Sequence, residues 1–364
     1  KFVETHENFL NQGKTERNSS TYDTENTLFQ DNPVVILTQI RSCAKKKDLL
    51  KGIRIHTHIL KRGHLLLEKD IYIGSALVGL YAKCGEFSKA RNLLDYLPLR
   101  NVVSWTSLIS GYTQLGMAKE ALICYEEMQC EGISPDASTY VCALKACGFS
   151  GNVEKGGKIH ASILCHRFSH KNVIIGTALV DMYTRFGALE KAQEVFDAIP
   201  GKDVFIWTVL MSGFTRYGHY EEALRCFEKF HVQGYSLDVS IFVCILKTCG
   251  GLGLIEKGKD IHTMIIREGL LQKSMLVSTA LVEMYARCGA LTKARQVLYK
   301  LPSRKVASWN ALITGYTREG HTEEAMECFN TMRQEGLTPD SITFICILRV
   351  CGDTGAVWMG RKIH

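Results

Sequence analysis

The feature that most constrains this chain is a period of 102 residues, marked by Trp105, Trp207 and Trp309. Several other positions keep the same interval, namely Tyr81, Tyr183, Tyr285, Pro98, Pro200 and Pro302. A fixed period is typical of a solenoid, in which each repeat leaves an apolar face that only its neighbours cover. The sequence therefore predicts repeats stacked along one axis, as one elongated domain, instead of a single globular core.

Each 102-residue block divides into three units of 35, 36 and 31 residues. The units span 33–70, 71–101, 102–136, 137–172, 173–203, 204–238, 239–274, 275–305 and 306–340, with a partial unit at 341–364. Residues 1–32 carry six acidic and three basic side chains, unlike an Arg-rich, acid-poor transit peptide. We interpret them as a weakly ordered leader, and the partial last unit as the sign of a longer parent chain.

Each unit is predicted to form two helices. In unit 102–136, Leu108, Ile109 and Tyr112 recur at helical spacing and are followed by Gly116. A second apolar stripe then leads to Gly132. Glycine adopts the left-handed conformation that ends a helix at no steric cost. The fold class is therefore all-α, and no run of about 20 apolar residues predicts a membrane-spanning helix.

The fourteen cysteines suggest a metal or disulfide framework, but their positions follow the repeat period. Equivalent positions in stacked repeats lie far apart, and no Cys-x-x-Cys pair occurs in the sequence. We expect the cysteines to be small buried thiols. The sequence predicts no metal site and no cofactor.

Histidines also recur with the period. His219 and His321 each stand two residues before a glutamate, as in half of a zinc deaminase motif, but the matching Pro-Cys-x-x-Cys is missing. Helix capping and first-turn carboxylates explain these residues better. One further repeat position holds His56, His160, His262 and His364. No nucleophile, base and orienting group assemble in the sequence, so no catalytic residue is predicted.

The units resemble a known family. The segments that carry the resemblance are Val-Val-Ser-Trp-x-x-Leu-Ile-x-Gly-Tyr, Lys-Ala-Cys with Lys-Ile-His, and Ala-Leu-Val-Asp-Met-Tyr with Gly-Ala-Leu-Glu-Lys-Ala. They are similar to pentatricopeptide repeats over residues 33–364, and the alternating lengths resemble the plant class whose motifs are called P, L and S. The resemblance implies a right-handed superhelical solenoid of helix-turn-helix repeats.

The resemblance also implies a function. Such proteins bind single-stranded RNA sequence-specifically in chloroplasts or mitochondria, about one base per repeat, commonly to place a cytidine for C-to-U editing or to process a transcript. The implied partners are organellar RNA and other editing factors or a deaminase supplied in trans, with no membrane. The deaminase-like domain of many members is not found in this sequence, although one beyond His364 would add an activity.

Charge and geometry are compatible with RNA. Residues 33–364 contain 41 Lys and Arg against 31 Asp and Glu, a net charge of +10 that would attract phosphates. Stacked hairpins are expected to align their first helices along one concave surface. Such an array matches a splayed single strand that is read base by base.

In the family that the units resemble, the fifth and last residues of a unit read the base, and the second residue packs against base faces. Ser75 with Asn101 resembles the adenine combination. Three pairs resemble the guanine combination, namely Thr106 with Asp136, Thr177 with Asp203, and Thr208 with Asp238. Asn310 with Asp340 resembles a combination that favours uracil. Guanine shows two N–H donors and suits a carboxylate, whereas uracil shows one donor between two acceptors and suits an amide.

Three units depart from this pattern. Thr279 is paired with Lys305, which cannot accept a hydrogen bond from a base, so the preference of that unit stays open. The long units, with Val141 and Val243 at the fifth position, are interpreted as non-reading. The expected stacking residues are Tyr72, Val103, Ile174, Phe205, Leu276 and Ala307.

Other interpretations remain for these residues. Each paired Asp or Asn directly precedes a first helix and is also a good N-cap. The apolar second residues would also suit packing between repeats. For the whole chain, the alternative is a protein-binding scaffold like a tetratricopeptide solenoid. The unequal unit lengths count against it, because that class uses uniform 34-residue repeats.

Overall fold

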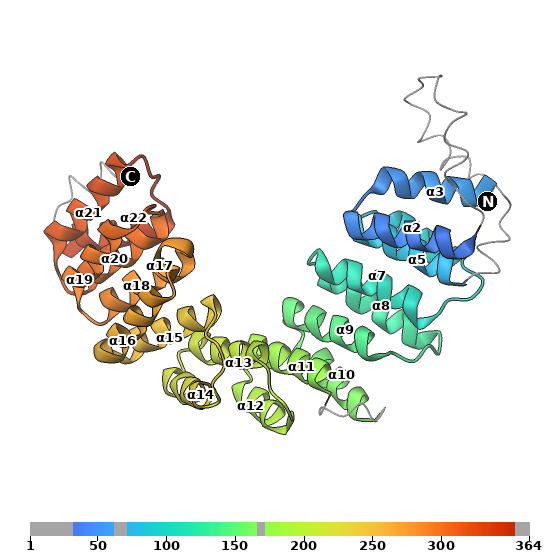
Figure 1. The fold of residues 1–364 in the computed structure, drawn as a ribbon, viewed down its shortest axis with the longest axis horizontal. Coiled ribbons are helices and arrows are strands. Elements are labelled where there is room, and N and C mark those ends of the chain that lie inside the picture. Colours follow the sequence, from blue (N-terminus) through green and yellow to red (C-terminus); the bar gives the residue numbers. More distant parts are fainter. Residues whose placement is uncertain (1–31, 62–70, 166–171, 354–364) are drawn as a thin grey trace, which may run out of the picture. The chain divides into compact units, whose positions relative to one another are not determined.

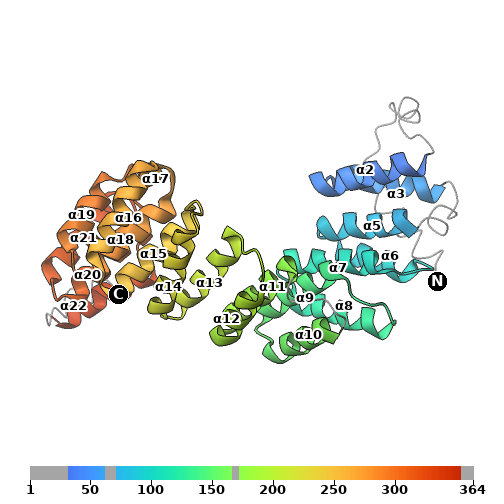
Figure 2. The same ribbon diagram turned by 60° about the horizontal axis from the view of Figure 1, so that its bottom comes forward.

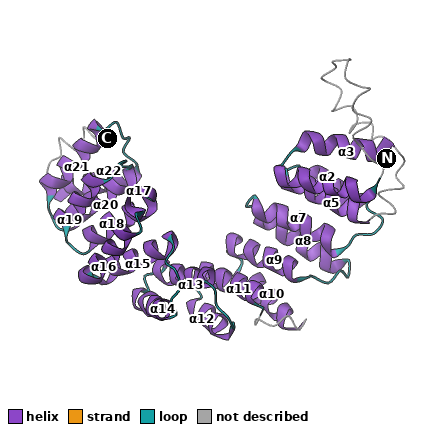
Figure 3. Cartoon of the chain, in the orientation of Figure 1, coloured by secondary structure: helices purple, strands orange, loops and turns teal. Residues whose placement is uncertain are grey.

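The computed structural model describes residues 32–61, 71–165 and 172–353, and these residues form twenty helices. Within them the structure contains helices, turns and loops but no strand (Figure 3). The chain is thus an all-helical repeat protein, as predicted. The expected leader at 1–32 lies outside the described residues, apart from Asn32.

The chain divides into two compact parts between Ser150 and Gly151, and each is described by itself. The N-terminal part contains α2 (Pro33–Lys46), α3 (Leu49–Lys61), α5 (Ile71–Lys83), α6 (Phe87–Tyr96), α7 (Val102–Gln114), α8 (Ala118–Cys130) and α9 (Ala137–Ser150). Helices α2, α5, α7 and α9 follow one another through this part in both views (Figures 1 and 2).

The C-terminal part repeats this hairpin pattern. Its helices are α10 (Val153–Cys165), α11 (Val173–Phe186), α12 (Leu189–Ala198), α13 (Val204–Arg216), α14 (Tyr220–Val232), α15 (Val239–Leu252), α16 (Ile255–Arg267), α17 (Leu270–Lys273), α18 (Met275–Arg287), α19 (Leu291–Lys300), α20 (Val306–Arg318), α21 (Thr322–Gln334) and α22 (Ser341–Asp353). The four-residue helix α17 was not predicted. It lies in the connection that closes unit 239–274.

The start of a first helix is fixed by a polar side chain at the preceding residue. Asn101 Oδ1 accepts a hydrogen bond from the backbone N–H of Ser104 at 2.9 Å. Asp203 and Asp238 cap α13 and α15 in the same way, at 2.9 and 2.8 Å. Such a cap satisfies an N–H that the helix leaves unpaired. The expectation that these residues act as N-caps is confirmed.

The predicted glycine breaks are also confirmed. Gly116 separates α7 from α8 with φ +76°, and Gly132 ends the second helix of the same unit with φ +74°. Both values lie in the left-handed region, where a side chain would clash with the backbone. Each hairpin therefore closes within a few residues and returns antiparallel to itself.

First helices pack directly against the first helices of neighbouring repeats. In the N-terminal part, α7 contacts both α5 and α9, and in the C-terminal part α20 contacts both α18 and α22. Small residues permit a close approach: a Cβ at Gly111 would stand 2.7 Å from Cβ of Ala82, and one at Gly315 would stand 2.9 Å from Cβ of Ala286. The first helices thus form a continuous layer within each part, and the second helices cover its other side.

The repeated histidines link the second helix of a long unit to the first helix of the next unit. The imidazole Nδ1 atoms of His56, His160 and His262 lie 2.8, 2.8 and 2.9 Å from the hydroxyl oxygens of Tyr81, Tyr183 and Tyr285. Burial lowers the pKa of His262 and raises that of Tyr285, which keeps both groups neutral. These histidines serve repeat packing. His364 lies outside the described residues.

The expected capping role of His219 and His321 is wrong, because neither side chain makes a cap hydrogen bond. Their Nδ1 atoms instead lie 3.9 Å from Glu222 and 3.6 Å from Glu324. These glutamates occupy the first turn of the helix, as expected for carboxylates near a helix N-terminus.

The periodic tryptophans are buried, but their indole N–H groups differ in their partners. Trp105 Nε1 donates to Glu131 at 3.0 Å, and Trp309 Nε1 donates to Glu335 at 3.2 Å. Each glutamate also pairs with an arginine near the end of the preceding unit, Arg100 at 2.9 Å and Arg304 at 2.6 Å. Trp207 Nε1 is buried without a hydrogen-bond partner.

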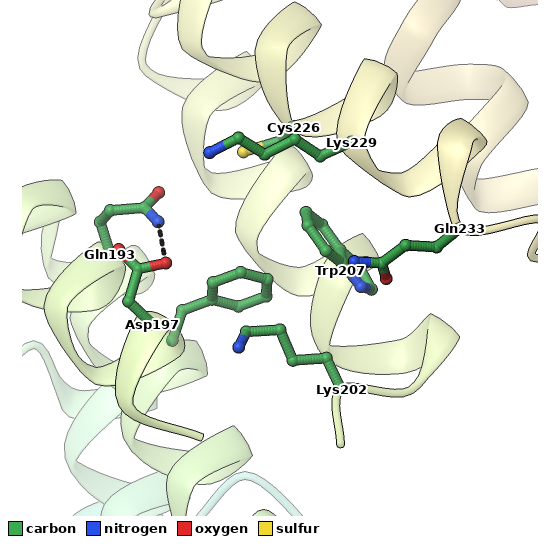
Figure 4. Close-up of a pocket in the computed structure, with 8 residues that line it drawn as sticks. Gln193, Asp197, Lys202, Trp207, Cys226, Lys229 and Gln233 are labelled. Atoms are coloured by element: carbon green, nitrogen blue, oxygen red, sulfur yellow. Dashed lines mark hydrogen bonds between the residues drawn. The ribbon is translucent and has the colours of Figure 1, made fainter. Parts of the chain in front are cut away.

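A cavity of about 140 Å³ lies beside Trp207 (Figure 4). Three substitutions relative to the other two blocks account for it: Gln193 replaces an arginine, Lys202 replaces an arginine, and Gln233 replaces the glutamate. In the first block Arg91 covers the indole, with Cζ 5.4 Å from the ring centroid. Gln193 is shorter and donates to Asp197 at 2.9 Å instead. The cavity is therefore a gap left by the repeat sequence.

Replacing Gln233 by Glu should stabilise the C-terminal part. The new carboxylate would accept from Trp207 Nε1 and lie near Lys202, as Glu131 lies near Arg100. A hydrogen bond to a charged group at such an exposed position contributes about 1 kcal/mol, equivalent to a rise of roughly 2–4 °C in melting temperature. Circular dichroism melts would measure it.

The matched control is Glu335→Gln, which removes the carboxylate charge from the same contact in the last block and should lower the melting temperature by a similar amount. If neither variant moves the transition, the indole contact does not contribute to stability.

Candidate nucleic-acid interface

The predicted site residues lie at the N-terminal ends of the first helices. The second and fifth residues of a unit belong to the first and second turns of its first helix, and the last residue is the N-cap position of the next unit's first helix. Because consecutive first helices pack side by side, the fifth residue of a unit contacts the N-cap of the next at Ser75 with Asn101 and at Asn310 with Asp340. Helix geometry thus brings together two residues about 30 positions apart.

Two of the predicted pairs are joined directly. Ser75 Oγ lies 3.3 Å from Oδ1 of Asn101, and Asn310 Nδ2 donates to Asp340 Oδ1 at 2.8 Å. Ser75 and Asn310 are buried, at 3% and 5% exposure, whereas Asp340 is exposed. One member of each pair is therefore held inside the helix layer, and the other stands at its surface.

A third pair is joined through an intermediate hydroxyl. Thr106 Oγ1 lies 2.6 Å from Thr139 Oγ1, and the Thr139 hydroxyl donates to Asp136 Oδ1 at 2.8 Å. Thr139 is fully buried. It is the third residue of its unit and did not enter the sequence prediction.

In two further pairs the threonine hydroxyl donates a hydrogen bond within its own helix. The hydroxyl of Thr177 donates to the carbonyl of Val173 at 2.6 Å, and that of Thr208 donates to the carbonyl of Val204 at 2.8 Å. Both threonines are half-buried, and their partners Asp203 and Asp238 are exposed caps. The structure gives no hydrogen bond within either pair among the residues that it describes.

The pair that departs from the pattern has a different cap. Lys305 stands at the N-cap of α20 with an exposed side chain, and its backbone N–H donates to Ser308 Oγ at 3.2 Å. Thr279 is half-buried. An ammonium beside the threonine hydroxyl offers only donors, unlike every other predicted pair.

The predicted stacking residues are solvent-exposed. Exposure is 67% for Tyr72, 50% for Val103, 68% for Ile174, 64% for Phe205 and 70% for Leu276, and Ala307 is also exposed. A residue that packed between repeats would be buried, so these exposures do not support the packing alternative. Exposed apolar side chains thus recur at the same position in the first helices of the 35- and 31-residue units.

The long units present a different surface at the same positions. Val141 and Val243 are half-buried, and the second residues there are the exposed Ser138 and Ser240. The last unit differs, because Ile342 and Ile345 are both exposed at its second and fifth positions. Sequence reasoning did not select these isoleucines, although their place in the unit identifies them.

The acidic cap Asp340 is charged at neutral pH. The pKa of Asp340 is lowered first by the backbone N–H of Thr343, and further by the side chains of Asn310 and Thr343. Hydrogen bonds that favour the carboxylate form have this effect. The surface therefore offers carboxylate acceptors that suit base N–H groups and disfavour close phosphates.

Most of the cysteines are buried or half-buried, but Cys130 and Cys165 are exposed, so the expectation of buried thiols is wrong for these two. Burial raises the pKa of the Cys124, Cys226 and Cys249 thiols to about 11, which keeps them protonated at neutral pH. Across the described part of the chain, no group of three or more His, Cys, Asp or Glu residues could hold a metal ion. In the same ranges, no helix has the length and apolar character that crossing a bilayer requires.

Comparison with known proteins places these repeats in a wider group. The PPR repeat family matches residues 100–148 and 304–353, and the PPR repeat matches residues 177–204 and 205–235. A mitochondrial pentatricopeptide repeat-containing protein of Arabidopsis thaliana is 33% identical over 87% of this chain and 50% of the relative. The chloroplastic protein CRR2 of the same plant is 33% identical over 89% of this chain and 50% of its own length. The chain thus spans about half the length of these curated relatives.

The fold is similar to that of a solved structure. The crystal structure of the pentatricopeptide repeat protein PPR10 in complex with an 18-nt psaJ RNA element aligns with a TM-score of 0.78 and 16% identity, over 94% of this chain and 51% of that chain. A crystal structure of the pentatricopeptide repeat protein PPR10 from maize aligns with a TM-score of 0.64. At this identity the likeness shows a shared fold of stacked helix pairs.

Proposed function

The chain belongs to the plant pentatricopeptide repeat family, and we propose that it binds single-stranded RNA sequence-specifically, about one base per repeat. The observation that carries the proposal is one exposed apolar residue beside one pair of polar positions, which recurs at the start of the first helices of the 35- and 31-residue units. Apolar and aromatic side chains stack on bases, and paired polar groups contact base edges. PPR10, which shares the fold, was solved with an RNA element bound.

The chemistry of each pair supports a base preference. Thr208 uses its hydroxyl hydrogen within its own helix, so it offers lone pairs outward beside the Asp238 carboxylate. Two acceptors suit the two N–H donors on the Watson–Crick edge of guanine. The amide of Asn310 donates one N–H to Asp340 and has a second for a base carbonyl, which suits uracil.

The rest of the proposal concerns the cellular role. Relatives carry mitochondrial and chloroplastic names, and we place this chain in one of these organelles. The alternation of 35-, 36- and 31-residue units supports the class with P, L and S motifs. In such a role the chain selects the RNA site for C-to-U editing or transcript processing, and a deaminase or other editing factor in trans supplies the reaction.

A selection from a random RNA pool should recover A-G-n-G-G-n-n-U for units 71–101 through 306–340, with the N-terminal unit toward the RNA 5′ end. Guanine is expected at the second, fourth and fifth places. The selected RNA, extended by a downstream cytidine and sequenced after incubation, should show no C-to-U change. The proposal would be contradicted if the selected RNAs show the reversed order or no guanine preference. It would also be contradicted if the chain binds a protein partner but no RNA.

Replacing Thr208 by Asn should change the preference at the fifth place from guanine toward uracil. The amide adds an N–H donor where the threonine offers lone pairs, and Asp238 still caps α15. A base-edge contact contributes about 1–3 kcal/mol by analogy with groove readout, so the switch should exceed roughly fivefold in relative affinity. Fluorescence anisotropy with the two RNAs would measure it.

The control for this substitution is the melting temperature, which should barely move. An unchanged base preference in a variant that melts like the original chain would show that Thr208 faces no base, and the other pair assignments would lose their support.

A further inference from the structure

We infer that Thr343 and Thr139, the third residues of two long units, are positioning residues that hold the base-reading side chain of the preceding unit. Each is fully buried, and each contacts both members of the preceding pair. This inference rests on the proposed RNA-binding function. It adds a residue outside the pair that determines how strictly the pair discriminates between bases.

Thr343 and Asp340 bind the two polar ends of the Asn310 amide. Thr343 Oγ1 lies 2.6 Å from Asn310 Oδ1, and Asn310 Nδ2 donates to Asp340 Oδ1 at 2.8 Å. The opposite amide orientation would place its oxygen against the carboxylate, where no hydrogen is available. The carbonyl must therefore face Thr343, and the amide presents its second N–H as the group left for a base.

The threonine hydroxyl itself has only one hydrogen. It lies 2.6 Å from Asn310 Oδ1 and 2.9 Å from Asp340 Oδ1, and it also accepts the Asp340 backbone N–H at 3.2 Å. Asp340 Oδ1 already receives the backbone N–H of Thr343 at 2.9 Å and the Asn310 amide. The hydroxyl hydrogen is therefore best used by Asn310, which has no other donor at its oxygen in the described structure.

In the Thr106 pair, a similar arrangement fixes the hydrogen-bond directions of the Thr106 and Thr139 hydroxyls. Thr139 donates to the Asp136 carboxylate, the strongest acceptor in reach, so the 2.6 Å contact is made by Thr106 donating to Thr139. Thr106 then has only lone pairs left for a base. Its polarity toward RNA is set by a residue that does not reach the RNA itself.

The third long unit supplies an internal comparison. Its third residue is Ile241, buried and apolar, and the preceding Thr208 donates to the Val204 carbonyl instead. Serines at the third position of two other units, Ser104 and Ser308, bond the backbone of the cap residue. Among the described residues, a third-position hydroxyl that contacts the fifth residue of the preceding unit occurs at Thr139 and Thr343.

The test is base discrimination at the eighth place, measured with RNAs that carry U, C, A or G there. Thr343→Val removes the hydroxyl and keeps the branched shape, and it should lower the preference for uracil at least threefold while preferences at the other places stay unchanged. Thr343→Ser keeps the hydroxyl and should retain the preference. Ile241→Val, the matched change where no hydroxyl exists, should leave the fifth place unaltered.

The outcomes separate this inference from the proposed function. If the original chain prefers uracil at the eighth place and Thr343→Val keeps that preference, the positioning role is wrong and the RNA-binding proposal stands. If the original chain binds RNA with no preference there, both the pair assignment and the positioning role fail. A loss of preference at every place would mean a general structural defect and would also contradict the inference.

A second variant pair keeps the test decisive if Thr343→Val folds poorly. Ile241→Thr in the Thr208→Asn background installs the missing hydroxyl beside a new amide. The double variant should prefer uracil at the fifth place at least threefold more strongly than Thr208→Asn alone. Equal preferences in two variants with matching circular dichroism melts would overturn the inference.

Discussion

Everything in this structure depends on the direct packing of one first helix on the next. Glycines at Gly111 and Gly315 lie against the alanines Ala82 and Ala286, at separations that no additional side-chain carbon could occupy. The close approach places the N-terminal turn of each first helix beside the turn before it. Without that contact, the fifth residue of one unit and the cap of the next would belong to separate surfaces.

The cap residue then has two roles that share one atom. Oδ1 of Asp340 accepts the backbone N–H of Thr343, which fixes the start of α22, and it also accepts the amide of Asn310. Capping and base reading were alternatives for these residues in the sequence, and the geometry makes them compatible. The local stability of the start of α22 and the orientation of the Asn310 amide therefore depend on the same carboxylate.

The period predicted much of the fold, because apolar stripes and glycine breaks are local signals. The N-caps at Asp203 and Asp238 were also readable, since a cap and its helix are neighbours in sequence. Contacts between units could not be predicted from such local signals, because the residues that make them are far apart in the sequence. The histidine to tyrosine contacts join residues 23 to 25 positions apart, and the bridge through Thr139 joins residues 33 apart. The assignments of bases to pairs remain predictions.

Deviations from the period were as informative as the period itself. Gln233 interrupts the indole to glutamate contact that the other two blocks keep, and it leaves Trp207 Nε1 unpaired. Ile241 interrupts the hydroxyl bridge in the same block of the sequence. In a repeat protein, each block serves as a reference for the others, so a single chain contains its own matched comparisons.

The central claim is that the first helices carry the RNA-facing surface. Ultraviolet crosslinking of the chain to a single-stranded RNA, followed by mass spectrometry of the crosslinked peptides, tests it directly. The account predicts crosslinks in α5 and α13, at the exposed aromatic residues Tyr72 and Phe205. Tyr299 is an exposed aromatic residue on the second helix α19 and serves as the internal comparison. Crosslinks concentrated at Tyr299 and the other second helices, with none at Tyr72 or Phe205, would contradict the account.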